Sequence, residues 1–416
     1  MSAATTTSID PILKRLYSKD RFEKALYTNN PLLGLLPKNE DFGGADMRIA
    51  LMYAPTAGGS ATFSNSQSNQ VGAAYKGFNL TRVSDYSTFL ISSEALKASK
   101  GDANALVSGL ETEGDAALHT LQRSIAKKVY RNGGGAIGRV GSTSTVTLTL
   151  LELSDIVNFE VNMKIDSDDV DGTSGSVDGD GRVITKVDRD LGTLTTAANW
   201  TGSGNYANSD YLFRDGDFGL AMSGLDAWVP SSAPASTAFF GVDRTADATR
   251  LGGIRFTASA GTDGTLERAL IRAAARVARE GGKPDYVFMN PEDAYQLDWE
   301  LGTKRQYETV TAQSASGSVG TIGYDSIRVV TPGGMVKVCA DHNCPKGVAW
   351  MLQMDTWILA SLGPAAGWLM DDGNRILRAS TSDAYEGRMG GYMNLGCKAP
   401  GWNARLNISA VVNATV

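Results

Sequence analysis

Residues 102–131 read DANALVSGLETEGDAALHTLQRSIAKKVYR, and this stretch decides the fold because it predicts one long helix. Apolar and small residues recur at spacings of three or four and share one narrow face: Leu106, Leu110, Gly114, Ala117, Leu121, Ile125 and Val129. Asp102 can cap the start, and Gly133 to Gly135 can stop the end. At ~1.5 Å per residue the helix would span roughly 45 Å. We expect a strut whose second face meets something outside the subunit; an ordinary long core helix is the alternative.

Composition limits the classes of protein that fit. The chain has 416 residues, 42% of them hydrophobic and 20% charged, enough to bury the cores of two or three domains. Its net charge of −6 argues against tight nucleic-acid binding, which needs clustered Lys and Arg. The polar N-terminal residues predict no secretory signal, and no apolar run is long enough for a membrane helix. Three cysteines are too few for a disulfide framework. We expect a soluble protein made in a reducing cytosol.

Two segments before the strut lack an evident core of their own. Residues 1–45 predict an arm with a short amphipathic helix over Ile9–Tyr27, followed by Asn30-Pro31 and Leu36-Pro37. Met47–Leu90 predicts a long two-stranded ribbon whose tip, Ala54–Gln70, is rich in Gly, Ser and Asn. We expect the ribbon to leave an apolar face bare and to bury it against a neighbouring subunit. Shortening the tip should therefore impair assembly more than folding.

The part after the strut predicts an α+β domain that carries an insertion. Short strands and acidic turns over Val157–Phe218 suggest a small, partly open β-barrel that is stable semi-independently. Thr265–Gly281 then predicts an amphipathic helix, Asp285–Met289 a strand, and Asn290-Pro291 the start of another helix. Later strands are expected at Ile327–Val330, Val336–Cys339, Val348–Leu352, Ile358–Ser361 and within Tyr385–Val416.

One glycine-rich motif and one acidic motif could bind a ligand, but the secondary structure predicted around them does not fit such sites. Residues 133–138 match G-x-G-x-x-G, yet a helix precedes them and none follows, so we read a flexible joint. Ser167–Gly172 with Asp178 partly matches a calcium loop. Ser replaces the first Asp, Asp replaces the final Glu, and no helices flank it, so a solvated acidic turn is the better interpretation.

A second group of residues could bind zinc. Cys339, Asp341, His342 and Cys344 lie within six residues, and Cys397 could join them. A structural zinc site needs four ligands, usually as two close pairs, and the second pair is missing. Core cysteines beside a surface loop fit better, and His119 should be solvated on the polar side of the strut. We predict no catalytic, cofactor-binding or metal-binding residues and no cofactor.

The order of these parts resembles the major capsid protein of tailed bacteriophages, which has the Hong-Kong-97-type fold. Local stretches are similar to that family as well: Asn29–Leu33, Pro284–Pro291, Cys344–Trp350 and Arg388–Leu395. The resemblance implies an α+β capsid fold with an N-arm, an extended E-loop hairpin, a peripheral domain with a long spine helix, and an axial domain with a small β-barrel-like insertion. It implies these bounds: 1–45 arm, 46–82 E-loop, 83–135 peripheral domain, 136–384 axial domain with the insertion at 157–218, and 385–416 closing strands of the peripheral domain.

The resemblance also implies a function and partners. Such proteins are not enzymes; they form hexamers and pentamers of an icosahedral shell around double-stranded DNA, bound without sequence readout. A virion capsid assembled in the host bacterial cytoplasm is implied, with portal, scaffold and decoration proteins as partners and no membrane. No charged scaffolding segment precedes the arm, so cleavage on maturation is not expected, and no crosslink is assigned to Lys76. The alternatives are an encapsulin-like shell that encloses cargo enzymes, and a hydrolase or metalloprotein that uses the Cys339–Cys344 cluster.

Overall fold

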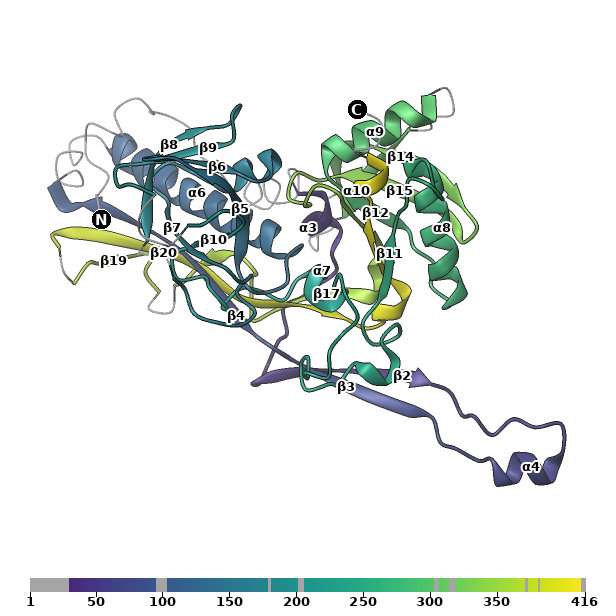
Figure 1. The fold of residues 1–416 in the computed structure, drawn as a ribbon. Helices are drawn as coiled ribbons and strands as arrows, with labels where there is room; N and C mark the ends of the chain where they lie inside the picture. Colours follow the sequence, from purple (N-terminus) through teal and green to yellow (C-terminus); the bar gives the residue numbers. More distant parts are fainter. Residues whose placement is uncertain are drawn as a thin grey trace.

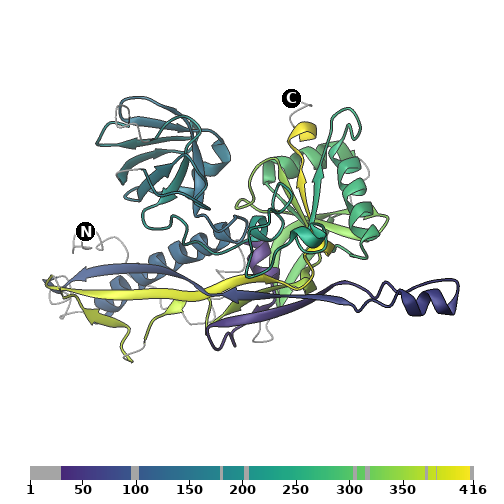
Figure 2. The same ribbon diagram turned by 60° about the horizontal axis from the view of Figure 1, so that its bottom comes forward.

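In the computed structural model a single long helix, labelled α6 in Figure 1, lies between a barrel and a long sheet, as Figure 2 shows. The structure describes residues 30–94, 103–178, 181–200, 206–302, 307–313, 319–370, 373–380 and 382–412, with only the backbone described within 103–112 and 307–325. The expected helix at Ile9–Tyr27 lies outside these residues. No helix within them has the length and apolar character to cross a membrane.

The central helix is α6 (Ala103–Lys128), which confirms the predicted strut. Its apolar face is buried at the positions with described side chains: Ala117, Leu118, Leu121, Ile125, Ala126 and Val129. These residues pack against β4 and β20, which are strands of the sheet below. The last turns of the opposite face contact the barrel of the same chain, so our expectation that this face meets something outside the subunit is wrong for the C-terminal half.

The sheet below α6 is formed by distant parts of the chain. Its main path is β1 (Lys38–Asn39), β17 (Trp357–Ser361), β20 (Ala384–Cys397) and β18 (Gly367–Trp368), with β4 (Val83–Ser92) and β19 (Ile376–Arg378) also paired to β20. α3 (Pro31–Leu35) and the following turn bury Leu32, Leu33 and Leu36 in this core. The described end of the arm therefore packs on its own subunit.

A two-stranded ribbon extends from this sheet (Figure 2). β2 (Asp46–Ala54) pairs with β3 (Ala74–Thr81), and α4 (Phe63–Ser68) lies at the far end. We expected Val83–Ile91 to return the ribbon, which is wrong, because these residues form β4 and pair with β20 over ten positions. The ribbon is therefore shorter at its base than the sequence suggested.

The predicted insertion is a closed barrel with the strand order β10-β5-β6-β9-β8-β7. Its strands are β5 (Ala136–Thr143), β6 (Thr147–Leu150), β7 (Lys164–Asp168), β8 (Arg182–Asp188), β9 (Thr193–Thr196) and β10 (Tyr211–Arg214), with the 3-10 helix η2 (Leu153–Asn158). The barrel differs from the expectation in two ways: it is closed, and it begins at Ala136 rather than Val157. β5 and β6, which precede the acidic segment Val157–Phe218, are needed to complete the ring. They bury Val140 and Leu148 inside it.

The remaining sheet has seven strands in the order β11-β21-β16-β12-β15-β14-β13. Their bounds are β11 (Ile254–Thr257), β12 (Tyr286–Met289), β13 (Tyr307–Gln313), β14 (Val319–Thr331), β15 (Gly334–Ala340), β16 (Val348–Leu352) and β21 (Ala404–Asn407). Helices α8 (Leu266–Arg279) and α9 (Pro291–Leu301) bury their apolar faces with this sheet. The predicted cap Asn290 is confirmed, since its side chain accepts a backbone N–H bond at the start of α9, and Thr265 accepts one in the same way at the start of α8.

Short elements complete the chain, and two sequence segments divide differently from the expectation. The short helices are α7 (Leu225–Trp228), α10 (Ser409–Val412), η3 (Thr245–Asp247), η5 (Met354–Thr356) and η6 (Pro400–Trp402).

β17, β18 and β19 pair with β20 although we placed them in the axial domain. β21 closes the seven-stranded sheet rather than the sheet of β20, because it pairs with β11 and β16. Strand pairing between distant segments carries no local sequence signal.

Candidate assembly surfaces

The outer part of the ribbon is uncharged and exposes large apolar side chains. No charged residue occurs between Arg48 and Lys76. Within this stretch Phe63 is 83% exposed, Tyr75 66% and Val71 60%. α4 stands at the end of the ribbon, away from the rest of the subunit (Figure 2). Exposed apolar side chains on a protruding hairpin without charges are typical of a surface that another protein covers.

The base of the ribbon is attached to its own subunit. Ile49, Phe78 and Leu80 are buried in the core beneath β20, and Arg250 donates a hydrogen bond to the carbonyl oxygen of Tyr53 at 2.7 Å. We expected the face that carries Ile49 to be the bare one, which is wrong. The apolar residues that remain exposed lie nearer the tip and on the opposite face, such as Met52.

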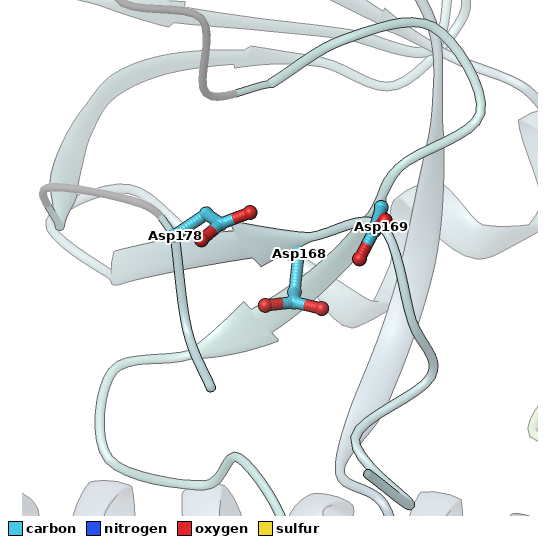
Figure 3. A group of neighbouring side chains, drawn as sticks. All are labelled: Asp168, Asp169 and Asp178. Carbon is cyan, nitrogen blue, oxygen red and sulfur yellow. The ribbon is translucent and has the colours of Figure 1, made fainter. Parts of the chain in front are cut away.

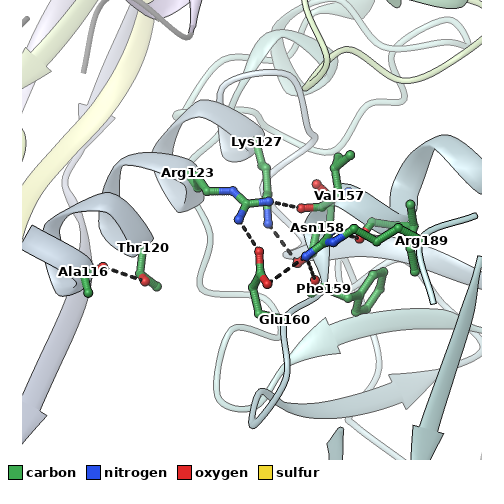
Figure 4. A network of polar contacts seen from close by, with 10 residues as sticks. Ala116, Thr120, Arg123, Lys127, Val157, Asn158, Phe159, Glu160 and Arg189 are labelled. Atoms are coloured by element: carbon green, nitrogen blue, oxygen red, sulfur yellow. Dashed lines mark hydrogen bonds and ion pairs between the residues drawn. The ribbon is translucent and has the colours of Figure 1, made fainter. Parts of the chain in front are cut away.

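The barrel is fastened to α6 by polar contacts (Figure 4). Arg123 bonds the carboxylate of Glu160 and the carbonyl of Val157. Lys127 donates to the carbonyl of Asn158 at 2.9 Å, and Glu160 also accepts from Arg189 at 2.8 Å. Arg123, Lys127, Asn158 and Glu160 line part of a groove of about 500 Å³ between α6, β4 and the barrel. The basic end of the helix therefore positions the barrel.

Two buried and two partly buried charges join the sheet, the helix and the barrel at one point. Asp85 of β4 accepts from Lys128 at 3.0 Å and from Arg214 at 2.7 Å. Asp217 completes the group, with 3.1 Å to Lys128 and 3.0 Å to Arg214. Burial opposes ionisation of Asp85, but Lys128, Arg214 and a hydrogen bond from Ser124 together hold its pKa below the ordinary value. Two acids and two bases in contact form a balanced network that fixes the three elements together.

Lys127 lies beside this network and titrates unusually. Burial, together with the neighbouring cations Arg123 and Arg214, lowers its pKa from 10.5 to about 7. Sequence analysis missed both Lys127 and the four-charge network. The signal available was Ser124 followed four residues later by Lys128 on the otherwise apolar face of the helix, since a lysine there needs a carboxylate partner.

The acidic turn suggested by the calcium-like motif lies at the end of β7 (Figure 3). Carboxylate oxygens of Asp168, Asp169 and Asp178 lie within 4.8 Å of one another. Asp168 is buried, and burial with repulsion from Asp178 and Asp169 raises its pKa, although Val170 donates a backbone bond to it. Asp169 and Asp178 are exposed. The three carboxylates repel one another, and among the described residues no fourth His, Cys, Asp or Glu joins them.

The cysteines lie on different elements. Cys339 is buried on β15, Cys344 lies in the following turn 3.5 Å from the carbonyl oxygen of Val348, and Cys397 lies on β20 beside Asn403. Burial raises the pKa of Cys339 and of Cys397 to about 12. His342 is exposed. Within the described part of the chain these side chains do not form a group with metal-ligand spacing.

Asp341, which we considered as a ligand, has a structural contact instead. It accepts hydrogen bonds from the buried hydroxyl of Tyr130 at 2.8 Å and from Asn343 at 2.9 Å. Asn343 also bonds Asn30, at the start of the described arm, at 2.8 Å. The group therefore ties the end of α6 and the arm to the turn after β15.

The remaining sequence candidates have structural positions too. The glycine run is the connection from α6 to β5, and a Cβ at Gly134 would lie 2.0 Å from the carbonyl oxygen of Asp171. This close approach explains the glycine without a nucleotide. His119 is exposed on α6, as predicted. Lys76 lies on β3 opposite Leu51.

Comparisons with known proteins identify the class. The family model described as SU10 major capsid protein matches residues 214–374. No curated protein matches the sequence. Among solved structures, the capsid asymmetric unit of cyanophage A-1(L) is 13% identical with a TM-score of 0.50, over 92% of this chain and 93% of that one.

Two further structures are less similar. Mycobacterium phage Ogopogo gives 11% identity and a TM-score of 0.41, over 97% of this chain and 99% of that one. The holo-SrpI encapsulin complex of Synechococcus elongatus gives 8% identity and a TM-score of 0.44, over 98% and 96%.

The chain has the Hong-Kong-97-type fold, as the fold that it shares with the cyanophage capsid subunit shows. The family match confirms the resemblance to the major capsid proteins of tailed bacteriophages. The chain is a structural protein of a capsid and not an enzyme.

Proposed function

We propose that this protein forms hexamers and pentamers that close an icosahedral shell around double-stranded DNA in a tailed-phage virion. The observation that carries the proposal is the ribbon, which extends away from the rest of the subunit and whose uncharged outer part exposes Phe63, Val71 and Tyr75. A neighbouring copy is the partner that buries such a tip in every subunit at once. The chain contributes structure only, with no catalytic, cofactor-binding or metal-binding residue.

The parts of the subunit receive proposed roles on this basis. Residues up to 45 form the arm, 46–82 the extended E-loop, and α6 with the sheet of β20 the peripheral domain. The seven-stranded sheet with α8 and α9 is the axial domain, whose loops meet at the centre of each capsomer. The barrel is an accessory module on the spine helix, and its bounds follow the strands at 136–214.

The remaining partners are also part of the proposal. The net charge of −6 favours a shell that contains DNA without binding base sequence. Assembly in the host bacterial cytoplasm, together with portal, scaffold and decoration proteins, follows from the proposed role in a tailed phage.

The contents of purified shells test the proposal. The full chain is expressed with the other proteins of its particle, shells are isolated, and their nuclease-resistant DNA and co-purifying proteins are measured. We expect double-stranded DNA protected inside shells. Shells that contain a stoichiometric enzyme and no protected DNA would identify an encapsulin-like compartment instead.

A further inference from the structure

The outer face of α8 carries a row of arginines. The helix buries its apolar side completely, including Leu270 and Val277. The opposite side exposes four cations: Arg268, Arg272, Arg276 and Arg279. Like charges four residues apart destabilise a helix, and they occur here in a chain whose net charge is negative. A row with that cost to helix stability points to an anionic partner.

The subunit itself neutralises only half of this row. Arg272 pairs with the buried carboxylate of Asp263, and Arg279 bonds Glu280. Among the described residues Arg268 and Arg276 form no ion pair, although Arg276 lies over the ring of Phe256 at 5.0 Å. Two exposed guanidinium groups therefore remain available for another molecule.

The matching negative surface is the barrel. Residues 136–218 contain 6 Lys and Arg against 14 Asp and Glu, a net charge of −8, whereas the rest of the chain carries +2. At the end of β7, Asp169 and Asp178 are exposed, and within the described ranges no cation pairs with either. Several of the barrel's other acids are already used at its contact with α6, such as Glu160, Asp155 and Asp217.

The two surfaces lie on opposite sides of one subunit. Figures 1 and 2 both show the barrel on one side and α8 on the other, with the ribbon extending toward the α8 side. They are therefore separated within a subunit, but a head-to-tail neighbour can bring them together. Contacts between different surfaces of identical subunits generate closed rings when the rotation allows it.

We infer that the arginine face of α8 binds the acidic barrel of a second copy of this chain within a ring of subunits. The inference rests on the proposed shell assembly and adds a second, ionic contact to the uncharged contact of the ribbon tip. Salt should weaken the ionic contact selectively, because exposed charges are screened beyond about 8–10 Å at physiological ionic strength.

A charge swap tests this contact. Arg268→Glu with Arg276→Glu should lower the yield of closed shells about tenfold or more, since like charges at an interface cost several kcal/mol. Asp169→Lys with Asp178→Lys should lower it as well. The four changes combined should restore it, because the two reversed surfaces attract again. Thermal unfolding of free subunits shows whether each variant folds. If the arginine reversal does not fold, Arg268→Gln with Arg276→Gln replaces it.

The outcomes separate the inference from the proposed function. If wild-type chains close shells and both reversals leave shell yield and its salt dependence unchanged, the contact does not exist while the shell role stands. Shells of normal yield that lose packaged DNA in the α8 variant would place the arginines against the genome and overturn the inference. If wild-type chains never close shells, the proposed function itself is wrong.

Discussion

At the scale of single residues, the most consequential feature is the contact of Asp85, Lys128, Arg214 and Asp217. This contact joins α6 and β4, which also share an apolar core, to a barrel that is acidic overall. Buried ion pairs add little net stability compared with apolar packing, yet removing one partner leaves charges buried without compensation. Such a network specifies how the parts are arranged more than it strengthens them.

Asp85→Asn should therefore destabilise the subunit strongly. It removes the carboxylate that Lys128, Arg214 and Ser124 share, so we expect the free energy of unfolding to fall by about 3–5 kcal/mol. Urea denaturation of free subunits measures this. Glu160→Gln is the matched control, since its pairs with Arg123 and Arg189 are half-exposed and should contribute about 1 kcal/mol or less. Equal losses in the two variants would show that the network has no special role.

Lys127 predicts a pH dependence of stability. Its folded pKa of about 7 lies below the unfolded value of 10.5, so the unfolded chain binds more protons between these values. The free energy of unfolding should thus rise with pH above 7, by at most about 1.4 kcal/mol per pH unit from this group. Below pH 7 the cost of keeping Lys127 protonated in the folded protein is fully present. Lys127→Gln should remove that rise in denaturation measured from pH 7 to 9.5. The same slope in both proteins would mean that Lys127 is protonated normally.

At the scale of elements, the helices were predictable and the sheet partners were not. The spacing of Leu121, Ile125 and Val129 and the caps Thr265 and Asn290 are local signals, and α6, α8 and α9 follow them. Strand pairing depends on contacts across hundreds of residues, so β4 was assigned to the ribbon and β21 to the wrong sheet. The prediction left β5 and β6 out of the barrel, because composition marks only its acidic part. Closure of the ring depends on backbone pairing instead.

The barrel should be removable as a unit. Its two ends lie side by side, since the N–H of Gly219 donates to the carbonyl oxygen of Gly134 at 2.9 Å. Replacing residues 135–218 with a short Gly-Ser linker should leave a subunit that unfolds cooperatively, because the barrel core is separate from the core beneath α6. The free energy of unfolding should fall somewhat, because Lys128 keeps its ion pair with Asp85 but loses its ion pair with Asp217.

Calorimetry of that deletion checks the prediction. A matched variant that cuts inside the barrel, replacing residues 166–217, leaves β5 without β10 and β6 without β9, so it should expose apolar surface and aggregate. If removal of 135–218 abolished cooperative unfolding, the barrel would be part of the main folding unit.

At the scale of the whole molecule, the subunit is built to be incomplete alone. The cores beneath α6 and within the seven-stranded sheet are closed, yet the ribbon tip remains uncovered and α8 keeps unpaired arginines. Each contact that these surfaces can make is small, but a shell repeats it in every copy, so a modest loss per contact is multiplied across the assembly. Sequence order and the apolar ribbon predicted this role, whereas the ionic surface needed the structure to place barrel and α8 on opposite sides.

The most direct test of the central claim is electron microscopy of particles formed by the wild-type chain and by a variant lacking Pro55–Gln70, each expressed with the same partner proteins. Deletion removes α4 and the exposed Phe63 but leaves β2 and β3 paired at the base. We expect closed shells from the wild-type chain and folded subunits or capsomers, with few or no closed shells, from the variant. Wild-type shell yield from the deletion would contradict the role of the ribbon, and the absence of shells from the wild-type chain would contradict the account as a whole.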